Sequence, residues 1–190
     1  MKTGRLEAFS DGVLAIIITI MVLGLSAPDI SSFSALKPLI PKFTSYLLSF
    51  IYVGIYWNNH HHLFQATEKV NGRILWFNLF LLFMLSLLPI TTAWMGKNHF
   101  DKNPVALYGI NLLLCATAYA FLVKAVLKHE GKESTIGQAI QNTKKEYLSM
   151  AVYLIGTVIA FFMPILSVIG FFGVGIMWII PDKRIERNLK

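Results

Sequence analysis

The chain has 190 residues, of which 55% are hydrophobic and only 14% are charged. Soluble domains carry about 25% charged residues, and a soluble fold of this size could not bury so much apolar surface. The composition therefore excludes a soluble globular domain and indicates an integral membrane protein.

The formal net charge is +7. A basic balance is also typical of proteins that bind nucleic acids, but in membrane proteins Lys and Arg gather at the cytoplasmic ends of helices. We therefore expect the lipid bilayer, and no nucleic acid, as a partner. The single cysteine, Cys115, lies in an apolar stretch and predicts neither a disulfide framework nor a zinc site.

Charged residues divide the chain, and five of the uncharged stretches between them are long; the first four of these hold 17 to 25 residues each. A membrane-spanning helix needs about 20 apolar residues. We therefore predict one span in each stretch, with approximate bounds 5–26, 40–64, 73–95 and 104–126. The first stretch ends in Ser26-Ala27, which faintly resembles a signal-peptide cleavage site, but Glu7 and Asp11 precede it. Because a signal peptide is basic or apolar there, we expect an uncleaved helix.

The fifth stretch has 35 uncharged residues and Pro164 near its middle. As one helix it would reach about 52 Å, against a hydrocarbon core of about 30 Å. Proline interrupts helical hydrogen bonding, so we predict a hairpin of two short helices, 147–163 and 165–181, with a re-entrant element as the alternative. The whole chain, 1–190, is thus predicted to be a single all-α domain of six transmembrane helices.

The basic residues test this topology. With six spans and both termini in the cytoplasm, 13 of the 17 Lys and Arg residues lie inside. A five-span topology would place the basic C-terminal tail outside, against the positive-inside rule. We therefore expect a multi-pass protein of the cell (inner) membrane. The four basic residues expected outside are Lys37, Lys42, Lys97 and Lys102.

Polar residues in the first three spans are the candidates for chemistry. Asp11 lies six residues past Arg5, about 9 Å along the helix. A carboxylate at that depth usually faces protein or water, although both residues could simply mark a helix end. His60 and Asn78 reach a similar depth, which predicts a polar layer between three helices. His60, His61 and His62 are adjacent, so they point about 100° apart and cannot chelate one metal ion. We expect hydrogen bonding for His60 and interfacial exposure for the other two histidines.

Helix 1 also carries a stripe of three residues, Ile16, Thr19 and Leu23, at i, i+3 and i+7. Such spacing places them on one helix face. The stripe could pack or face lipid, with Thr19 bonding to its own backbone, or it could have a function. The partner of Arg5 also stays open.

The run from Arg5 to Gly12, followed by Ala15-Ile16 and Thr19, resembles the R-x-x-x-F-S-D signature of the transmembrane protein 175 family. These are lysosomal and endosomal potassium channels and their prokaryotic homologues. The resemblance implies a single-repeat homotetramer whose pore is lined by helix 1 of each subunit. It implies an apolar gate at Ile16, a selectivity layer at Thr19 and a further apolar layer at Leu23. The residues implied for the network that holds helix 1 are Arg5, Phe9, Ser10, Asp11, Trp57, His60 and Asn78.

The implied function is a potassium-permeable cation channel that needs no cofactor. The sequence has no T-V-G-Y-G filter, and Gly173-Val174-Gly175 is only slightly similar to one. One alternative is a proton-coupled secondary transporter that uses Asp11 and His60, but no internal repeat is visible. An intramembrane enzyme is the other alternative. No spacing indicates a nucleophile–base pair or a set of metal ligands, so we expect no enzyme.

Overall fold

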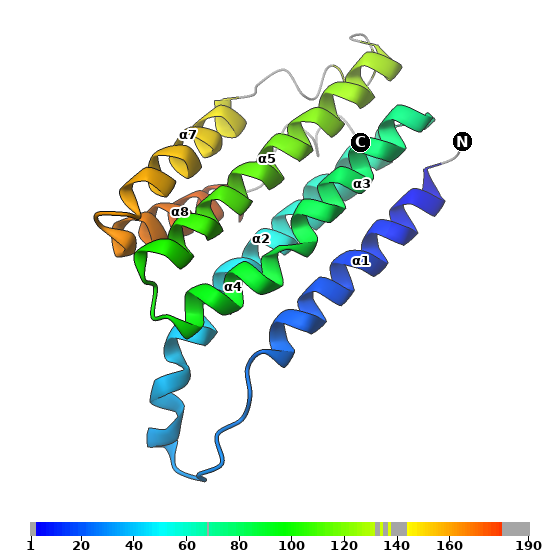
Figure 1. The fold of residues 1–190 in the computed structure, drawn as a ribbon. Helices are drawn as coiled ribbons and strands as arrows, with labels where there is room; N and C mark the ends of the chain where they lie inside the picture. Colours follow the sequence, from blue (N-terminus) through cyan, green and yellow to red (C-terminus); the bar gives the residue numbers. More distant parts are fainter. Residues whose placement is uncertain (1–2, 68, 132–133, 135–136, 138–143, 180–190) are drawn as a thin grey trace.

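The protein is a bundle of helices (Figure 1). A computed structural model describes residues 3–67, 69–131, 134, 137 and 144–179. Every regular element in these residues is helical, which confirms the predicted all-α class. The elements are α1 (Gly4–Leu23), the 3-10 helix η1 (Phe33–Leu39), α2 (Ile40–Gln65), α3 (Gly72–Ser86), α4 (Leu88–Lys97), α5 (Lys102–Glu130), α7 (Lys144–Ile159) and α8 (Pro164–Ile179).

Within the described residues, four helical segments are long and apolar enough to cross a membrane: α1, η1 with α2, α3 with α4, and α5. The predicted hairpin of two short helices is present as α7 and α8, but its bounds differ from 147–163 and 165–181. α7 ends at Ile159, and Pro164 is the first residue of α8, where its missing N–H costs no hydrogen bond. Each helix has 16 residues, about 24 Å, so two full spans remain a prediction. The predicted last two residues, 180–181, lie outside the described part.

The third predicted span, 73–95, is not one continuous helix. It breaks at Leu87, between α3 and α4. Pro89 causes the break, because it has no N–H to donate and its ring clashes with the carbonyl four residues earlier. Asn111 of α5 satisfies the backbone there: in the orientation that pairs both amide atoms, its nitrogen donates to the Met84 carbonyl (3.0 Å) and its oxygen accepts from the Leu88 N–H (3.3 Å).

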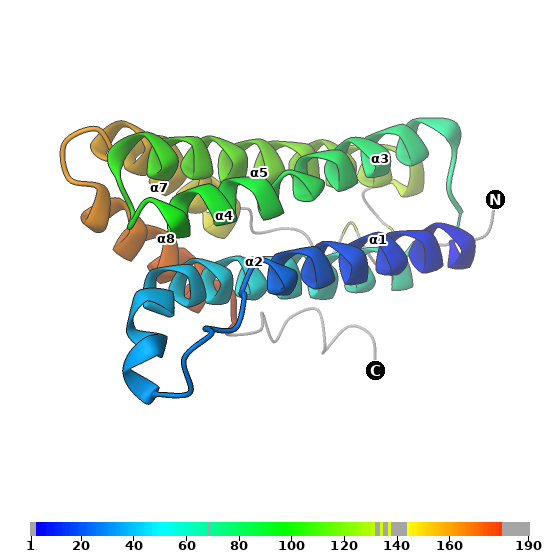
Figure 2. The same ribbon diagram turned by 60° about the horizontal axis from the view of Figure 1, so that its bottom comes forward.

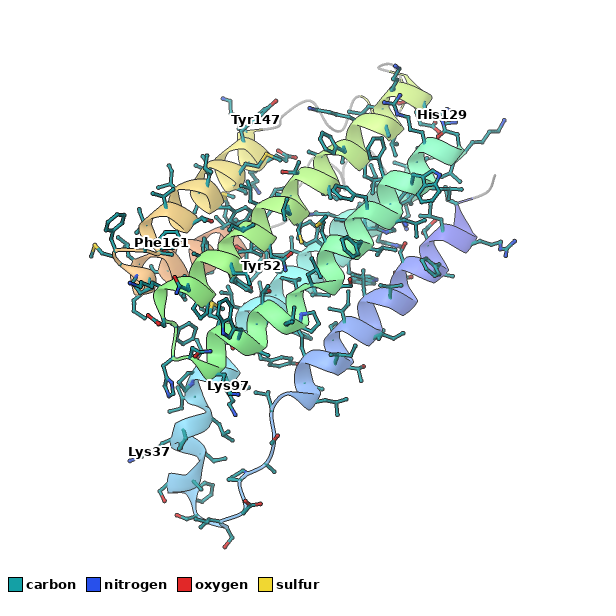
Figure 3. The ribbon with its side chains drawn as sticks, viewed as in Figure 1. Lys37, Tyr52, Lys97, His129, Tyr147 and Phe161 are labelled. Atoms are coloured by element: carbon teal, nitrogen blue, oxygen red, sulfur yellow. The ribbon has the colours of Figure 1, made fainter. Side chains whose placement is uncertain are left out.

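With η1 joined to α2 and α3 joined to α4, successive helical segments run in opposite directions, so the bundle has two distinct ends (Figures 1 and 2). We call the end where α1, α3 and α7 begin the basic end. In the part of the chain that the structure describes it holds Arg5, Lys69, Arg73, Lys124, Lys128, Lys144 and Lys145. The opposite end holds Lys37, Lys42, Lys97 and Lys102 (Lys37 and Lys97 are labelled in Figure 3). The tail residues Lys183, Arg184, Arg187 and Lys190, and Lys2 and Lys132, lie outside the described residues.

α2 and α5 form the centre of the bundle, and α1 lies at its edge against α2, α3 and α4 (Figure 1). Close helix packing depends on small residues. Gly96 lets α4 approach the start of α2, since a Cβ there would lie 2.8 Å from the Lys42 Cα and would collide with Ser45. Gly156 and Gly109 leave room for the ring of Phe171 from α8. Helix α1 has no comparable partner on its outer side, and this makes its outer face the first candidate site.

Candidate pore face and polar anchor of α1

Helix α1 has two faces of different character. The residues that face the bundle are buried: Leu6, Ser10, Leu14, Ile17 and Met21. On the other side, Ile16 is 60% exposed and Leu23 is 75% exposed, and Thr19 is exposed between them. The three residues of the predicted stripe therefore lie together on a surface that the chain itself leaves uncovered. In a membrane protein such a surface contacts lipid, a pore or a neighbouring subunit.

Thr19 is the hydroxyl on this otherwise apolar stripe. Its Oγ1 donates to the carbonyl of Ala15 at 2.9 Å, one turn earlier in the helix. This is the backbone hydrogen bond that the sequence allowed as an alternative to a functional role. The bond uses only the hydroxyl proton, however, and leaves the oxygen lone pairs available to accept. A backbone-bonded Thr19 can therefore still present an oxygen to a cation.

A buried chain of hydrogen bonds joins the inner face of α1 to α2 and α3. Asn78 Nδ2 donates to Ser10 Oγ at 3.0 Å, and Asn78 Oδ1 lies 2.8 Å from His60 Nε2. Ser10 Oγ in turn donates to the carbonyl of Leu6 at 2.9 Å. Because the Ser10 proton is committed to Leu6, Asn78 must donate to Ser10 and accept from His60, so Nε2 of His60 carries a proton. These three residues form the polar anchor of α1.

The sequence interpretation expected Asp11 to point into the bundle. In the structure it does not, and it is not part of this anchor. It is exposed on the surface of the subunit, where its Oδ1 accepts from Trp57 Nε1 at 3.0 Å. The reason is angular: Ser10 takes the inward position, and the next residue turns by about 100°. Asp11 and Trp57 thus form a second, separate link between α1 and α2, on the exposed surface of the subunit.

We expect Asp11→Ala to weaken this link without changing ion selectivity. The free energy of unfolding should fall by about 1 kcal/mol, because a hydrogen bond to a charged group is lost at an exposed site. Thermal unfolding and oligomer yield of the purified protein measure the effect. Asp11→Asn is the matched control, since its amide oxygen still accepts from Trp57. A well-folded Asp11→Ala protein with a shifted reversal potential would contradict the structural role.

Arg5 and Phe9 belong to the predicted network, but within one subunit they do not join it. Both side chains are exposed on α1, and Phe9 is 55% exposed. In the described part of the chain, no hydrogen bond or ion pair of the Arg5 guanidinium is found. Their membership of the network that holds α1 stays a prediction, and the partner of Arg5 stays open.

The sequence predicted that His61 and His62 are exposed at the membrane interface. In the structure both side chains are half-buried. His61 stacks on Trp57 with the rings 11° from parallel, and His62 lines a cavity beside α5 and α7. Among the residues with described placement, no three His, Cys, Asp or Glu side chains lie close enough to hold a metal ion.

A second polar cluster, absent from the sequence interpretation, lies deeper in the bundle. Ser49 of α2 pairs with Thr92 of α4 at 2.6 Å and with Tyr108 of α5 at 2.9 Å. Tyr52, labelled in Figure 3, donates to the Phe171 carbonyl of α8 at 2.7 Å. In the sequence each of these residues is visible only as a hydroxyl side chain in an apolar span. Such residues are so common that the sequence does not indicate which of them are hydrogen-bonded to one another.

Comparisons with known proteins identify the group to which the chain belongs. Residues 5–89, which include α2, α3 and all of α1 but its first residue, match the family of the endosomal/lysosomal potassium channel TMEM175. The chain is 56% identical to a potassium channel of Chryseobacterium sp. (strain P1-3) over 190 residues, which covers 100% of this chain and 99% of that protein. It is 32% identical over 129 residues to the endosomal/lysosomal proton channel TMEM175 of Danio rerio, and this match covers 65% of the chain but 24% of the fish protein.

The fold also matches a solved structure. The crystal structure of a lysosomal potassium-selective channel TMEM175 homolog from Chamaesiphon minutus superimposes with a TM-score of 0.81 and 28% identity, over 93% of this chain and 96% of that one. These relatives are named as channels and not as enzymes, which agrees with the expectation of no enzyme. The sequence match over nearly the whole length of the Chryseobacterium protein and the shared fold show that this chain is a member of the TMEM175 family.

Proposed function

We propose that the protein is a potassium-permeable cation channel, a homotetramer in which α1 of each subunit lines the pore. The observation that carries the proposal is the uncovered apolar face of α1, with the Thr19 hydroxyl on its stripe, inside the region that matches the family. Four such faces around an axis form an apolar pore with one hydroxyl layer. The related bacterial protein, named a potassium channel, supports potassium as the permeant ion.

Ile16 forms the gate in this proposal. A ring of apolar side chains stops ions by excluding water, without having to close the pore sterically. Leu23 lies about two turns further along α1, toward the end opposite to the basic end, and forms a second apolar layer there. The polar anchor on the inner face of α1 holds this helix at a fixed rotation, so that the stripe faces the axis.

The proposed channel does not use a selectivity filter of backbone carbonyls. Gly173-Val174-Gly175 lies within α8, where backbone carbonyls bond within the helix and cannot replace the hydration shell of an ion. Selectivity is therefore assigned to Thr19 together with dehydration at the Ile16 ring.

We expect Thr19→Val to lower the potassium-to-sodium permeability ratio by about two- to fivefold, which corresponds to an interaction of about 0.5–1 kcal/mol. Valine keeps the shape and removes the oxygen. Neutral hydroxyls favour the cation that sheds water more easily, which is potassium. Bi-ionic reversal potentials measure the ratio, and Thr19→Ser, which keeps a hydroxyl, is the control. An unchanged ratio in Thr19→Val would assign selectivity to dehydration alone.

The proposed orientation places the basic end in the cytoplasm of the cell, as the positive-inside rule requires. Both termini then lie in the cytoplasm, and the protein is a multi-pass protein of the cell (inner) membrane. No cofactor takes part, because the ion only passes through the pore.

A planar-bilayer recording of the purified protein under a potassium–sodium gradient tests the function. We expect discrete single-channel currents whose reversal potential lies closer to the equilibrium potential of potassium than to that of sodium. Slow, saturable, coupled flux without unitary currents would instead support the proton-coupled transporter with Asp11 and His60. Because the Danio rerio relative is named a proton channel, a second recording under a pH gradient separates proton current from potassium current.

A further inference from the structure

A cavity of about 320 Å³ lies away from the pore face, between α2, α5, α7 and α8. Its volume is in the range of about 300–1,000 Å³ that is common for sites of small molecules. Its lining extends from Tyr52, in the middle of the bundle, to Tyr147 at the start of α7 (both are labelled in Figure 3). On α5 its wall runs from Ala116 to Leu127, which is about 16 Å along the helix axis. The cavity is thus a slot parallel to the helices.

The two ends of this slot differ in chemistry. At mid-bundle its wall consists of apolar and aromatic side chains, among them Ile55, Ala120 and Tyr153. At the basic end the wall includes Lys124, Glu146 and His62. An apolar body with a polar head fits this gradient.

One polar atom in the wall points to a ligand. The Nδ1 atom of His62 is buried and has no hydrogen-bond partner in the described part of the chain. A buried polar atom without a partner is unfavourable, because it has given up its hydrogen bond to water. A hydroxyl or amide donor on the polar head of a ligand would satisfy this nitrogen at the charged end of the slot.

The side chains around the charged end match an interfacial lipid site. Trp178 Nε1 donates to Ser149 Oγ at 2.9 Å, and the ammonium of Lys145 lies 5.8 Å from the Trp178 ring centroid. Trp with Lys at this depth is typical of the headgroup region of a bilayer. Basic pockets between membrane helices on the cytoplasmic side bind anionic lipid heads. At this end of α5 and α7, four lysines outnumber two glutamates: Lys124, Lys128, Lys144 and Lys145 against Glu130 and Glu146.

We propose that the slot binds one acyl chain of an anionic amphiphile from the bilayer, with the head at Lys124. An anionic phospholipid and a free fatty acid share this chemistry. No residue of the α1 stripe lines the slot, so binding at this site can be tested without measuring ion conduction.

Fluorescence quenching of Trp178 by bromine-labelled chains tests the proposal. The probes are brominated dioleoyl-phosphatidylglycerol, brominated dioleoyl-phosphatidylcholine and a brominated fatty acid, added to the purified full chain in detergent. The Trp178 signal is the fluorescence lost in Trp178→Phe. We expect the anionic phospholipid to quench at a concentration about fivefold lower than the neutral one, as expected for one lysine near the head. Comparison with the fatty acid shows which anionic source binds more tightly.

Two pairs of variants locate the site. Lys124→Gln should raise the half-quenching concentration of the phosphatidylglycerol probe about fivefold, whereas Lys102→Gln, at the far end of the same helix, should not. Ala120→Phe fills the slot and should abolish quenching, whereas Leu114→Phe, at an exposed position of α5, should not. Quenching in Ala120→Phe equal to that of the natural chain would overturn the site. Equal quenching by both phospholipids, or no effect of Lys124→Gln, would overturn the anionic head.

Discussion

Replacing Ile16 with asparagine is expected to make the channel leak. In the proposed pore, four Ile16 side chains surround the axis and exclude water, so an ion meets a barrier of dehydration. Asparagine has nearly the same reach but offers an amide that binds water, and the constriction then stays wet. We expect the macroscopic current at a fixed voltage to rise about tenfold, which corresponds to a barrier lower by about 1.4 kcal/mol.

The chain offers a matched control for this variant. Ile169 of α8 is 60% exposed in the subunit, as is Ile16, but it lies on a different helix. Asparagine at Ile169 carries the same cost of placing an amide at an apolar surface and should leave the current unchanged. Equal currents for Ile16→Asn and the natural channel, at equal amounts of assembled protein, would remove Ile16 from the gate. A leak in both variants would show a general defect of membrane insertion or packing.

Asn78→Leu is expected to release α1 from the bundle. Leucine has a similar volume but neither accepts from His60 nor donates to Ser10, so two buried polar groups lose their partner at once. The cost should be about 1–2 kcal/mol, the range for hydrogen bonds between membrane helices, with more if the buried groups stay unsatisfied. The melting temperature in detergent and the fraction of assembled oligomer measure it.

A double-mutant cycle with Ser10→Ala separates this bond from the volume change. The two substitutions should be less than additive, because either one removes the bond between Asn78 and Ser10. Phe83→Leu serves as the control, since Phe83 is exposed on the same helix. Full additivity of Ser10→Ala and Asn78→Leu would mean that the polar anchor contributes no coupling between α1 and α3.

The local features of the fold follow from the sequence alone. Charged residues mark where apolar helices begin and end, and Pro164 marks the turn of the last hairpin, because these effects act within a few residues. The shared face of Ile16, Thr19 and Leu23 is equally local, since helical periodicity alone determines it. Pro89 is a local signal for the break between α3 and α4, as Pro164 is for the last hairpin. The prediction of one continuous span did not take Pro89 into account.

The partners of the polar residues depend on the tertiary structure. The sequence placed Asp11, His60 and Asn78 at a similar depth, but depth does not determine how each helix is rotated. Packing between segments far apart in the chain sets that rotation, and it directs Ser10 inward to Asn78, 68 residues away, while Asp11 turns outward to Trp57. For the same reason, the slot beside Lys124 could not be inferred from the sequence. It is formed by side chains of four helices, and only their packing decides whether space remains between them.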